Sequence, residues 1–316
     1  MRRTRPAVRY ALLGTHHSVR TGARAVDEPT GGGCGTIPRP PLLCPLPLTM
    51  LLDTHCHLTH DRYAADLPDV LARAHAAGVG GVVVVASNLE DAETVRALLD
   101  ASEEAVEGRP RLWGTAGIHP HEAAGAGPAL RQRLEEALDA HPRVVAVGEC
   151  GLDYHYDVSP RVKQRSVFEL HLEVAEARSM PVVVHCREAE DEMVSIVEEA
   201  GRAGVRGVLH CFPGDLLLLD AALAAGWLVS FTGLVTFPAF GGLDAVRQVP
   251  SDRYMLETDG PYLAPVPYRG RRNEPSRVVP IRDRVAEVRG EDPAEVERCT
   301  TETARNFFGL DGVQAR

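Results

Sequence analysis

Two histidines stand one residue apart, His55 and His57, in the stretch LLDTHCHLTH, directly after a short apolar run. In a β-strand, side chains two residues apart point to the same face. Both imidazoles could therefore bind a single metal ion. The alternative is structural, with one ring packed in the core and the other capping a loop, so the rest of the chain has to decide between the two.

Four further residues of metal-binding type follow other short apolar runs. They are Glu149 in AVGECGLDY, His185 in VVVHCRE, His210 in VLHCFPG and Asp259 in LETDGPYL. Each is predicted to stand at the end of a strand, and the ends of parallel strands meet at one edge of a sheet. This convergence of imidazoles and carboxylates favours a metal site over the structural alternative.

The number of ligands suits two metal ions. The first histidine pair and Asp259 can bind one ion, His185 and His210 can bind the other, and Glu149 lies between them. Two cations about 4 Å apart can share a hydroxide and stabilise both sides of a phosphoryl displacement. Because imidazoles are in the majority we expect Zn or Mn, and Mg is less well matched since it prefers oxygen ligands.

The elements that must position these residues follow a regular alternation from residue 50 onward. Strands are predicted at 51–54, 81–86, 112–117, 144–148, 181–184, 207–210, 227–231 and 254–258. Helices are predicted at 66–77, 90–101, 128–140, 161–178, 189–203, 215–225, 278–289 and 293–307. Eight strand–helix units in one domain predict a (β/α)8 TIM barrel. A doubly wound open sheet is the alternative, but the glycine-rich first turn typical of that fold is missing.

The chain divides into two regions by composition. Residues 1–49 contain a segment rich in glycine and proline and show no sustained hydrophobic period. We predict that this region is disordered or is a wrongly assigned extension ahead of Met50. Residues 50–312 are predicted to form the barrel domain.

Composition also excludes several functions. Lys163 is the only lysine and lies in a predicted helix, which argues against Schiff-base chemistry and a P-loop. The formal net charge of −10 argues against sequence-independent clamping of duplex DNA. No apolar run approaches the roughly 20 residues that span a membrane, so no membrane partner is expected. Seven cysteines without a CxxC pair indicate free thiols and a cytoplasmic location.

The combined motifs resemble the TatD family of metal-dependent hydrolases, within the amidohydrolase-like barrels. The motifs that carry the resemblance are DTHCHL, GIHPH, GECGLDY, HCR, HCF, ETDGPYL, RNEP and NFFGL, in the family's order. The resemblance covers about residues 50–312 and implies a TIM barrel. One departure is Pro213 in HCFPG, where many relatives have serine, and no ligand is lost there.

The resemblance also implies a two-metal site and a deoxyribonuclease that works as a 3′-5′ exonuclease on single-stranded DNA or 3′ ends. It assigns the first histidine pair, Glu149 and Asp259 to one metal, and Glu149, His185 and His210 to the other. Some members resemble deacylases of mischarged tRNA. Ester or amide hydrolysis, such as D-aminoacyl-tRNA deacylation, therefore stays open as an alternative, as does a non-catalytic binding barrel.

Asp259 and Glu149 are the predicted catalytic residues. We expect a metal-activated water to attack the phosphodiester, with Asp259 orienting this water and accepting its proton. The side chains predicted to contact substrate are His119, Arg187, Arg272 and Asn273. The two arginines could instead order a loop at the rim of the barrel. The sequence leaves the oligomeric state open.

Two further sets of residues are predicted to have structural roles. The cysteines that directly follow ligands are expected to turn away from the site and pack in the interior: Cys56, Cys150, Cys186 and Cys211. The histidines of the predicted helices are expected to face solvent: His75, His141 and His171.

Overall fold

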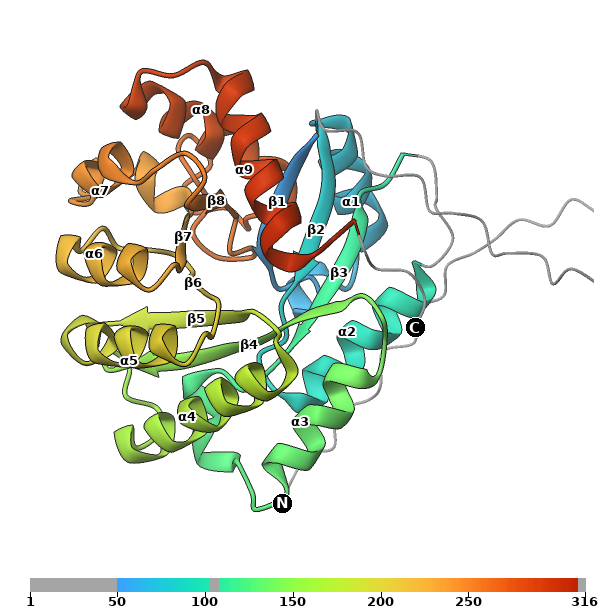
Figure 1. Ribbon diagram of the computed structural model, residues 1–316. Helices are drawn as coiled ribbons and strands as arrows, with labels where there is room; N and C mark the ends of the chain where they lie inside the picture. Colours follow the sequence, from blue (N-terminus) through green and yellow to red (C-terminus); the bar gives the residue numbers. More distant parts are fainter. Residues whose placement is uncertain (1–49, 103–107, 312–316) are drawn as a thin grey trace, which may run out of the picture. The chain divides into compact units, whose positions relative to one another are not determined.

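Eight parallel strands form one sheet in the order of the sequence in the computed structural model, which describes residues 50–102 and 108–311 (Figure 1). The strands are β1 Leu51–Cys56, β2 Val79–Val84, β3 Arg111–Ala116, β4 Val144–Asp153, β5 Val182–Arg187, β6 Gly207–Leu209, β7 Leu228–Phe231 and β8 Tyr254–Leu256. The predicted (β/α)8 barrel is confirmed. The predicted region 1–49 lies outside the described residues, and the limits of the barrel domain stay a prediction.

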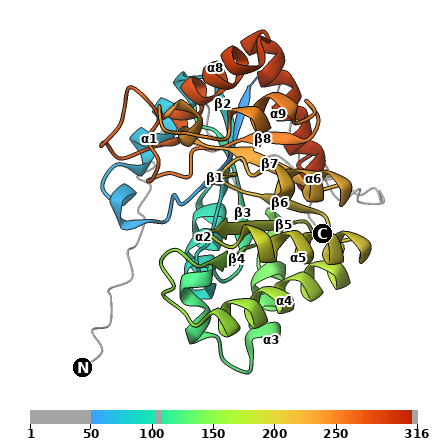
Figure 2. The same ribbon diagram turned by 90° about the vertical axis from the view of Figure 1, so that its left-hand side faces the viewer.

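Helices follow the strands and lie on the outside of the sheet in both views (Figures 1 and 2). They are α1 Leu67–Ala76, α2 Leu89–Ala101, α3 Leu130–Asp139, α4 Arg161–Arg178, α5 Glu190–Arg202, α6 Leu216–Ala224, α7 Leu243–Gln248, α8 Val278–Arg289 and α9 Pro293–Phe308. The sequence analysis does not predict α7. This helix has six residues and follows a glycine pair, so it is too short to show a helical period.

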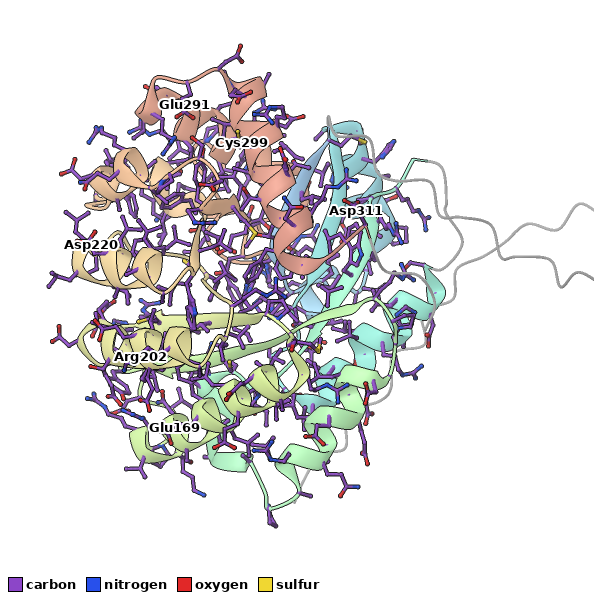
Figure 3. All side chains as sticks on the ribbon, viewed as in Figure 1. Glu169, Arg202, Asp220, Glu291, Cys299 and Asp311 are labelled. Atoms are coloured by element: carbon purple, nitrogen blue, oxygen red, sulfur yellow. The ribbon has the colours of Figure 1, made fainter. Side chains whose placement is uncertain are left out.

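The core consists of the strands and the inner faces of the helices. Every residue of β1, β2 and β4 is buried, as expected for parallel strands that helices cover. Trp113 and Trp227 are fully buried. Charged side chains such as Glu169 and Asp220 lie on the outer surface of the helices (Figure 3). Within the described ranges, no helix is long and apolar enough to cross a bilayer.

The barrel closes between β1 and β8 through a small number of specific contacts. The fully buried carboxyl group of Asp53 accepts hydrogen bonds from the backbone N–H and the hydroxyl of Thr258, at 2.8 and 2.6 Å. The Thr54 hydroxyl donates to the carbonyl of Leu256 at 3.1 Å. These bonds anchor β1 to the end of β8 and the segment that follows it.

Residues of the predicted metal site complete the same closure with their backbones. The amide of Asp259 donates to the carbonyl of His55, and the amide of His57 donates to the carbonyl of Gly260, both at 2.8 Å. Closing the barrel therefore places the first histidine pair beside Asp259.

Two of the three histidines predicted to face solvent are buried instead. His141 is 5% exposed and His171 is completely buried. The His171 ring accepts a hydrogen bond from the amide of Ile118 at 3.0 Å and donates to the carbonyl of Val167 at 2.7 Å. It thereby ties α4 to the segment after β3. Burial lowers the pKa of His171 to about 4, so the ring is neutral in the folded protein at neutral pH.

This neutral ring predicts a loss of stability in acid. In the unfolded chain His171 is protonated below about pH 6.5, whereas in the folded protein it is protonated only below about pH 4. The free energy of unfolding therefore falls as the pH drops from about 6.5 to about 4. The difference amounts to ~3 kcal/mol. In His171→Gln, which keeps a donor and an acceptor but does not titrate, urea unfolding between pH 7 and 4 should lack this component. Parallel curves for the two proteins would contradict the prediction.

Candidate metal centre

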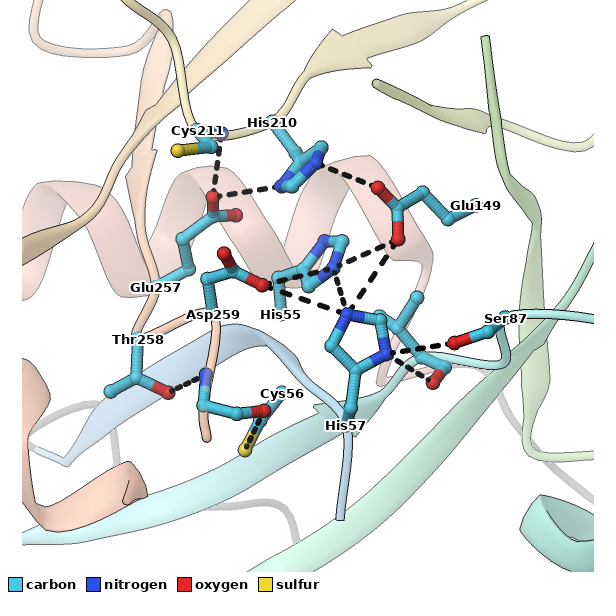
Figure 4. A network of polar contacts seen from close by, with 12 residues as sticks. His55, Cys56, His57, Ser87, Glu149, His210, Cys211, Glu257, Thr258 and Asp259 are labelled. Carbon is cyan, nitrogen blue, oxygen red and sulfur yellow. Dashed lines mark hydrogen bonds and ion pairs between the residues drawn. The ribbon is translucent and has the colours of Figure 1, made fainter. Parts of the chain in front are cut away.

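The six residues predicted as metal ligands lie together toward the carboxyl-terminal side of the barrel, and Figure 4 shows all of them except His185. In a first cluster, the Nε2 atoms of His55 and His57 are 3.2 Å apart. Asp259 Oδ1 lies 3.6 Å from His57 Nε2. Glu149 Oε2 lies 3.4 Å from His55 Nε2 and 3.6 Å from His57 Nε2.

A second cluster lies on the other side of the Glu149 carboxylate. His185 Nδ1 and His210 Nε2 are 3.1 Å apart. Both atoms approach Glu149 Oε1, at 3.0 and 2.8 Å respectively. The two oxygens of Glu149 thus face different clusters, which is the arrangement that the sequence analysis predicts for a carboxylate between two ions.

The donor atoms fit divalent cations. Two ligands on a tetrahedral zinc ion, each about 2.0–2.1 Å from the metal, lie about 3.3 Å apart, close to the nitrogen–nitrogen distances in both clusters. Glu149 Oε2 is buried and, among the described residues, accepts no hydrogen bond. The far nitrogens of two rings are held by other groups, His57 Nδ1 by the carbonyl of Val85 and His210 Nδ1 by Glu257. This leaves Nε2 of each ring directed at the cluster.

Charge balance in the site centres on Glu149, whose side chain is 2% exposed. Burial opposes its ionisation, but His210, His119 and His55 hold the pKa of Glu149 well below its usual range. Burial likewise opposes a charge on His210, yet Glu149 and Glu257 raise the pKa of this ring well above its usual value. The site therefore stabilises positive charge beside a buried carboxylate.

Glu149 does not stand at the end of a strand as predicted, because β4 continues to Asp153. Its pairing with β5 shifts register between Val147 and Cys150, which is a bulge at Glu149. Gly148 and Gly151 flank it with φ of 130° and 135°, and a Cβ on Gly151 would lie 2.0 Å from the carbonyl oxygen of His185. Only glycine allows this close approach, and the bulge turns the carboxylate toward the histidines.

Asp153 is a site residue that the sequence analysis misses. One carboxylate oxygen, Oδ2, lies 3.2 Å from His185 Nε2 and 3.0 Å from His121 Nε2. Asp153 is 1% exposed, and its contacts with His185 and His121 outweigh burial and lower its pKa. The signal that could have found it is alternation, because positions 149, 151 and 153 share one face once the strand is known to continue.

Of the residues predicted to contact substrate, one lies in the cluster and another is exposed at the end of a strand. His119 joins the cluster, with Nε2 3.6 Å from Glu149 Oε1, and burial lowers its pKa to about 3. Arg187 is exposed at the end of β5, and its guanidinium lies 4.8 Å from the ring of Tyr156. Among the described residues, no carboxylate forms an ion pair with Arg187.

The structure does not bring Arg272 and Asn273 to the cluster. The guanidinium of Arg272 donates to both carboxylate oxygens of Asp66, at 2.6 and 2.8 Å. Asn273 is completely buried, and its amide donates to the carbonyl of Thr258 at 2.8 Å. These bonds favour the ordering of a rim loop, the alternative role that the sequence allows for this segment.

The cysteines next to the ligands are outside the candidate metal-binding groups, as predicted. Cys56, Cys150 and Cys186 are buried, whereas Cys211 is partly exposed and lies 3.5 Å from the hydroxyl of Thr232. The backbone of Cys211 has φ of 48°, a left-handed conformation, and its amide donates to Glu257 at 2.7 Å. Glu257 therefore holds both this turn and the ring of His210.

A parallel eight-stranded barrel with imidazoles and carboxylates at the carboxyl ends of its strands defines the class of metal-dependent hydrolase barrels. The chain belongs to the family of TatD-related DNases, whose model matches residues 52–309.

Individual relatives match over nearly their whole length. An uncharacterized metal-dependent hydrolase of Bacillus subtilis, YabD, is 36% identical over 263 residues, covering 83% of this chain and 100% of the relative. A 3′-5′ ssDNA/RNA exonuclease TatD of Pectobacterium carotovorum is 36% identical over 266 residues, covering 82% and 100%. The crystal structure of YJJV, a TatD homologue of Escherichia coli K12, superposes with a TM-score of 0.75 at 26% identity, covering 83% and 99%.

The position of Glu257 predicts an effect on metal affinity. Its carboxylate accepts from His210 Nδ1 at 3.3 Å and from the Ser230 hydroxyl at 2.6 Å. Glu257→Gln removes the charge that orients and polarises the His210 ring, so affinity for Mn should fall roughly 10- to 100-fold. Titration calorimetry measures this, with the exposed Glu176→Gln as the matched control. Equal affinities in both variants would contradict the role given to Glu257.

Proposed function

We propose that this protein is a divalent-metal-dependent deoxyribonuclease that removes nucleotides from the 3′ ends of single-stranded DNA. The observation that carries the proposal is the Glu149 carboxylate, with one oxygen 2.8 Å from His210 and the other 3.4 Å from His55. Membership of the TatD-related DNases and the exonuclease named in Pectobacterium support the same activity. The cytoplasmic location expected from the cysteines stays a prediction.

The residues divide into two sets of ligands. His55, His57 and Asp259 would hold one ion, His185 and His210 would hold the second, and Glu149 would contact both. Zn and Mn match the imidazole-rich donor set, and Mg matches it less well. Bound divalent ions would acidify a water molecule and stabilise charge on the phosphoryl oxygens.

Asp259 would accept the proton of the attacking water. Its side chain is 13% exposed, against 2% for Glu149, so it can reach a water that arrives from the open mouth of the barrel. Burial opposes its ionisation, but the contact with His57 and the charge of His55 lower the pKa of Asp259, which keeps it a proton acceptor. Asp259 has φ of 54°, a left-handed conformation that the bonds between β1 and β8 hold in place.

Arg187 is the one predicted phosphate-binding arginine that stays available. Arg187 is exposed at the end of β5, two residues after His185. The guanidinium of Arg272, by contrast, is paired with Asp66. The acidic body of the protein favours a substrate held locally by bound cations and Arg187 over one clamped along its backbone.

Ester or amide hydrolysis is the second candidate, because the same acidified water could attack a carbonyl. Paired assays on a 3′-hydroxyl DNA oligonucleotide and on a D-aminoacyl-tRNA, each with and without Mn, separate the two. The proposed function predicts metal-dependent shortening of the oligonucleotide. Deacylation without any shortening of DNA at high enzyme and metal concentrations would favour the second candidate.

The role of Asp259 predicts a specific loss of activity. Asp259→Asn removes the proton acceptor and one ligand, so kcat/KM on the oligonucleotide should fall roughly 10²- to 10⁴-fold. Chelation of divalent ions with EDTA should abolish cleavage by the unaltered protein. Asp220→Asn, at an exposed position on α6, serves as the matched control. Undiminished cleavage by Asp259→Asn would contradict the assignment.

A further inference from the structure

Only two aromatic side chains of the Phe, Tyr and Trp type are largely exposed among the described residues. They are Tyr156, at 56%, and Tyr262, at 47%. Aromatic rings carry a large apolar surface that proteins ordinarily bury. Tyr262 stands beside the ring of His57, a predicted metal ligand, and Tyr156 stands beside the ring of His121, which contacts Asp153. These contacts tie the exposed rings to the site.

Tyr262 stands beside the first cluster. Its ring lies edge-to-face against the ring of His57, with centroids 6.2 Å apart, and against that of His60 at 5.8 Å. Its amide donates to the carbonyl of Asp259 at 2.9 Å. The turn that carries the proton acceptor therefore also fixes this ring.

Tyr156 stands beside the opposite part of the centre. Its ring lies 5.5 Å from that of His121, and the guanidinium of Arg187 lies 4.8 Å from the ring centroid. Its amide donates to Asp153 Oδ1 at 2.8 Å. A site carboxylate thus anchors this tyrosine as well, and a cation that suits phosphate lies beside the ring.

The two rings stand on opposite sides of the proposed reaction centre. Tyr262 follows β8 and Tyr156 follows β4, and these strands lie across from one another in an eight-stranded barrel. Contacts below 4 Å lead from His57 through Glu149 and His185 to Asp153. A strand whose phosphate sits over Glu149 would carry its neighbouring bases toward the two tyrosines.

We propose that Tyr262 and Tyr156 form a pair of nucleobase subsites, each stacking an unpaired base on one side of the scissile phosphate. The inference rests on the proposed function. Stacking tolerates every base because each has a π-face, but it requires that face to be free. Bases in a duplex stack on one another, so these rings would favour single strands over paired ends.

The test removes each partner of the contact in turn. We would measure kcat/KM with Mn on a single-stranded oligonucleotide and on versions with an abasic tetrahydrofuran residue at each of the three 3′-terminal positions. Tyr262→Ala and Tyr156→Ala should each lower kcat/KM on the intact strand roughly tenfold or more. In the unaltered protein, kcat/KM should fall by a similar factor when the base that stacks on that tyrosine is removed. In the alanine variant, removing the same base should lower kcat/KM little further, because the stacking contact is already lost.

Aromatic replacement separates stacking from folding. Tyr262→Trp and Tyr156→Trp should retain most of the activity, because a larger ring still stacks. Val162→Ala, a change at an exposed apolar position of α4, is the matched control and should leave all ratios unchanged. In both alanine variants the ratio of kcat/KM on single-stranded substrate to kcat/KM on duplex substrate should be smaller than in the unaltered protein.

Several outcomes would overturn the inference. One is full activity of both alanine variants on the intact strand. Another is a loss in each variant that is equal on intact and on all abasic strands, because a structural role would act regardless of the base. If the unaltered protein cleaves no strand at all, the proposed function itself fails, which is a different result.

Discussion

The arrangement of the site and of the strands around it depends on compensating the charge of one buried carboxylate, that of Glu149. An ionised carboxylate in a protein interior costs several kcal/mol unless compensating charge and hydrogen bonds surround it. Here five imidazoles approach its two oxygens. His210, His119 and His55, together with the hydrogen bond from His185, hold its pKa low against the effect of burial. Without cations, protons on the histidines must supply the compensating charge. Divalent ions at the same place would supply it more fully, and so would displace those protons.

The fold meets this constraint with two local devices. A bulge in β4, between Gly148 and Gly151, turns Glu149 toward the histidines. On the opposite side, the bonds that join β1 to β8 run through the backbones of the ligands themselves. Closing the barrel and assembling the first cluster are therefore one structural event. Binding of cations to the folded state should consequently stabilise the whole barrel.

Periodicity predicts most of this architecture, because helices and parallel strands leave strong patterns in the sequence. The longer helices begin and end within two residues of the predicted bounds. Periodicity does not reveal a bulge, because glycines interrupt the alternating pattern of a strand. The sequence analysis therefore does not predict that β4 continues to Asp153. The burial of His171 and the pairing of Arg272 with Asp66 depend on partners 53 and 206 residues away. Residue type alone cannot reveal such distant partners.

The central proposal is that Glu149 contacts two divalent cations, one on either side of its carboxylate. Anomalous diffraction from crystals of the protein grown with Mn tests it most directly. We predict two anomalous peaks, one against His55 and His57 and the other against His185 and His210, with Glu149 in contact with both. A single peak, or peaks remote from Glu149, would contradict the account.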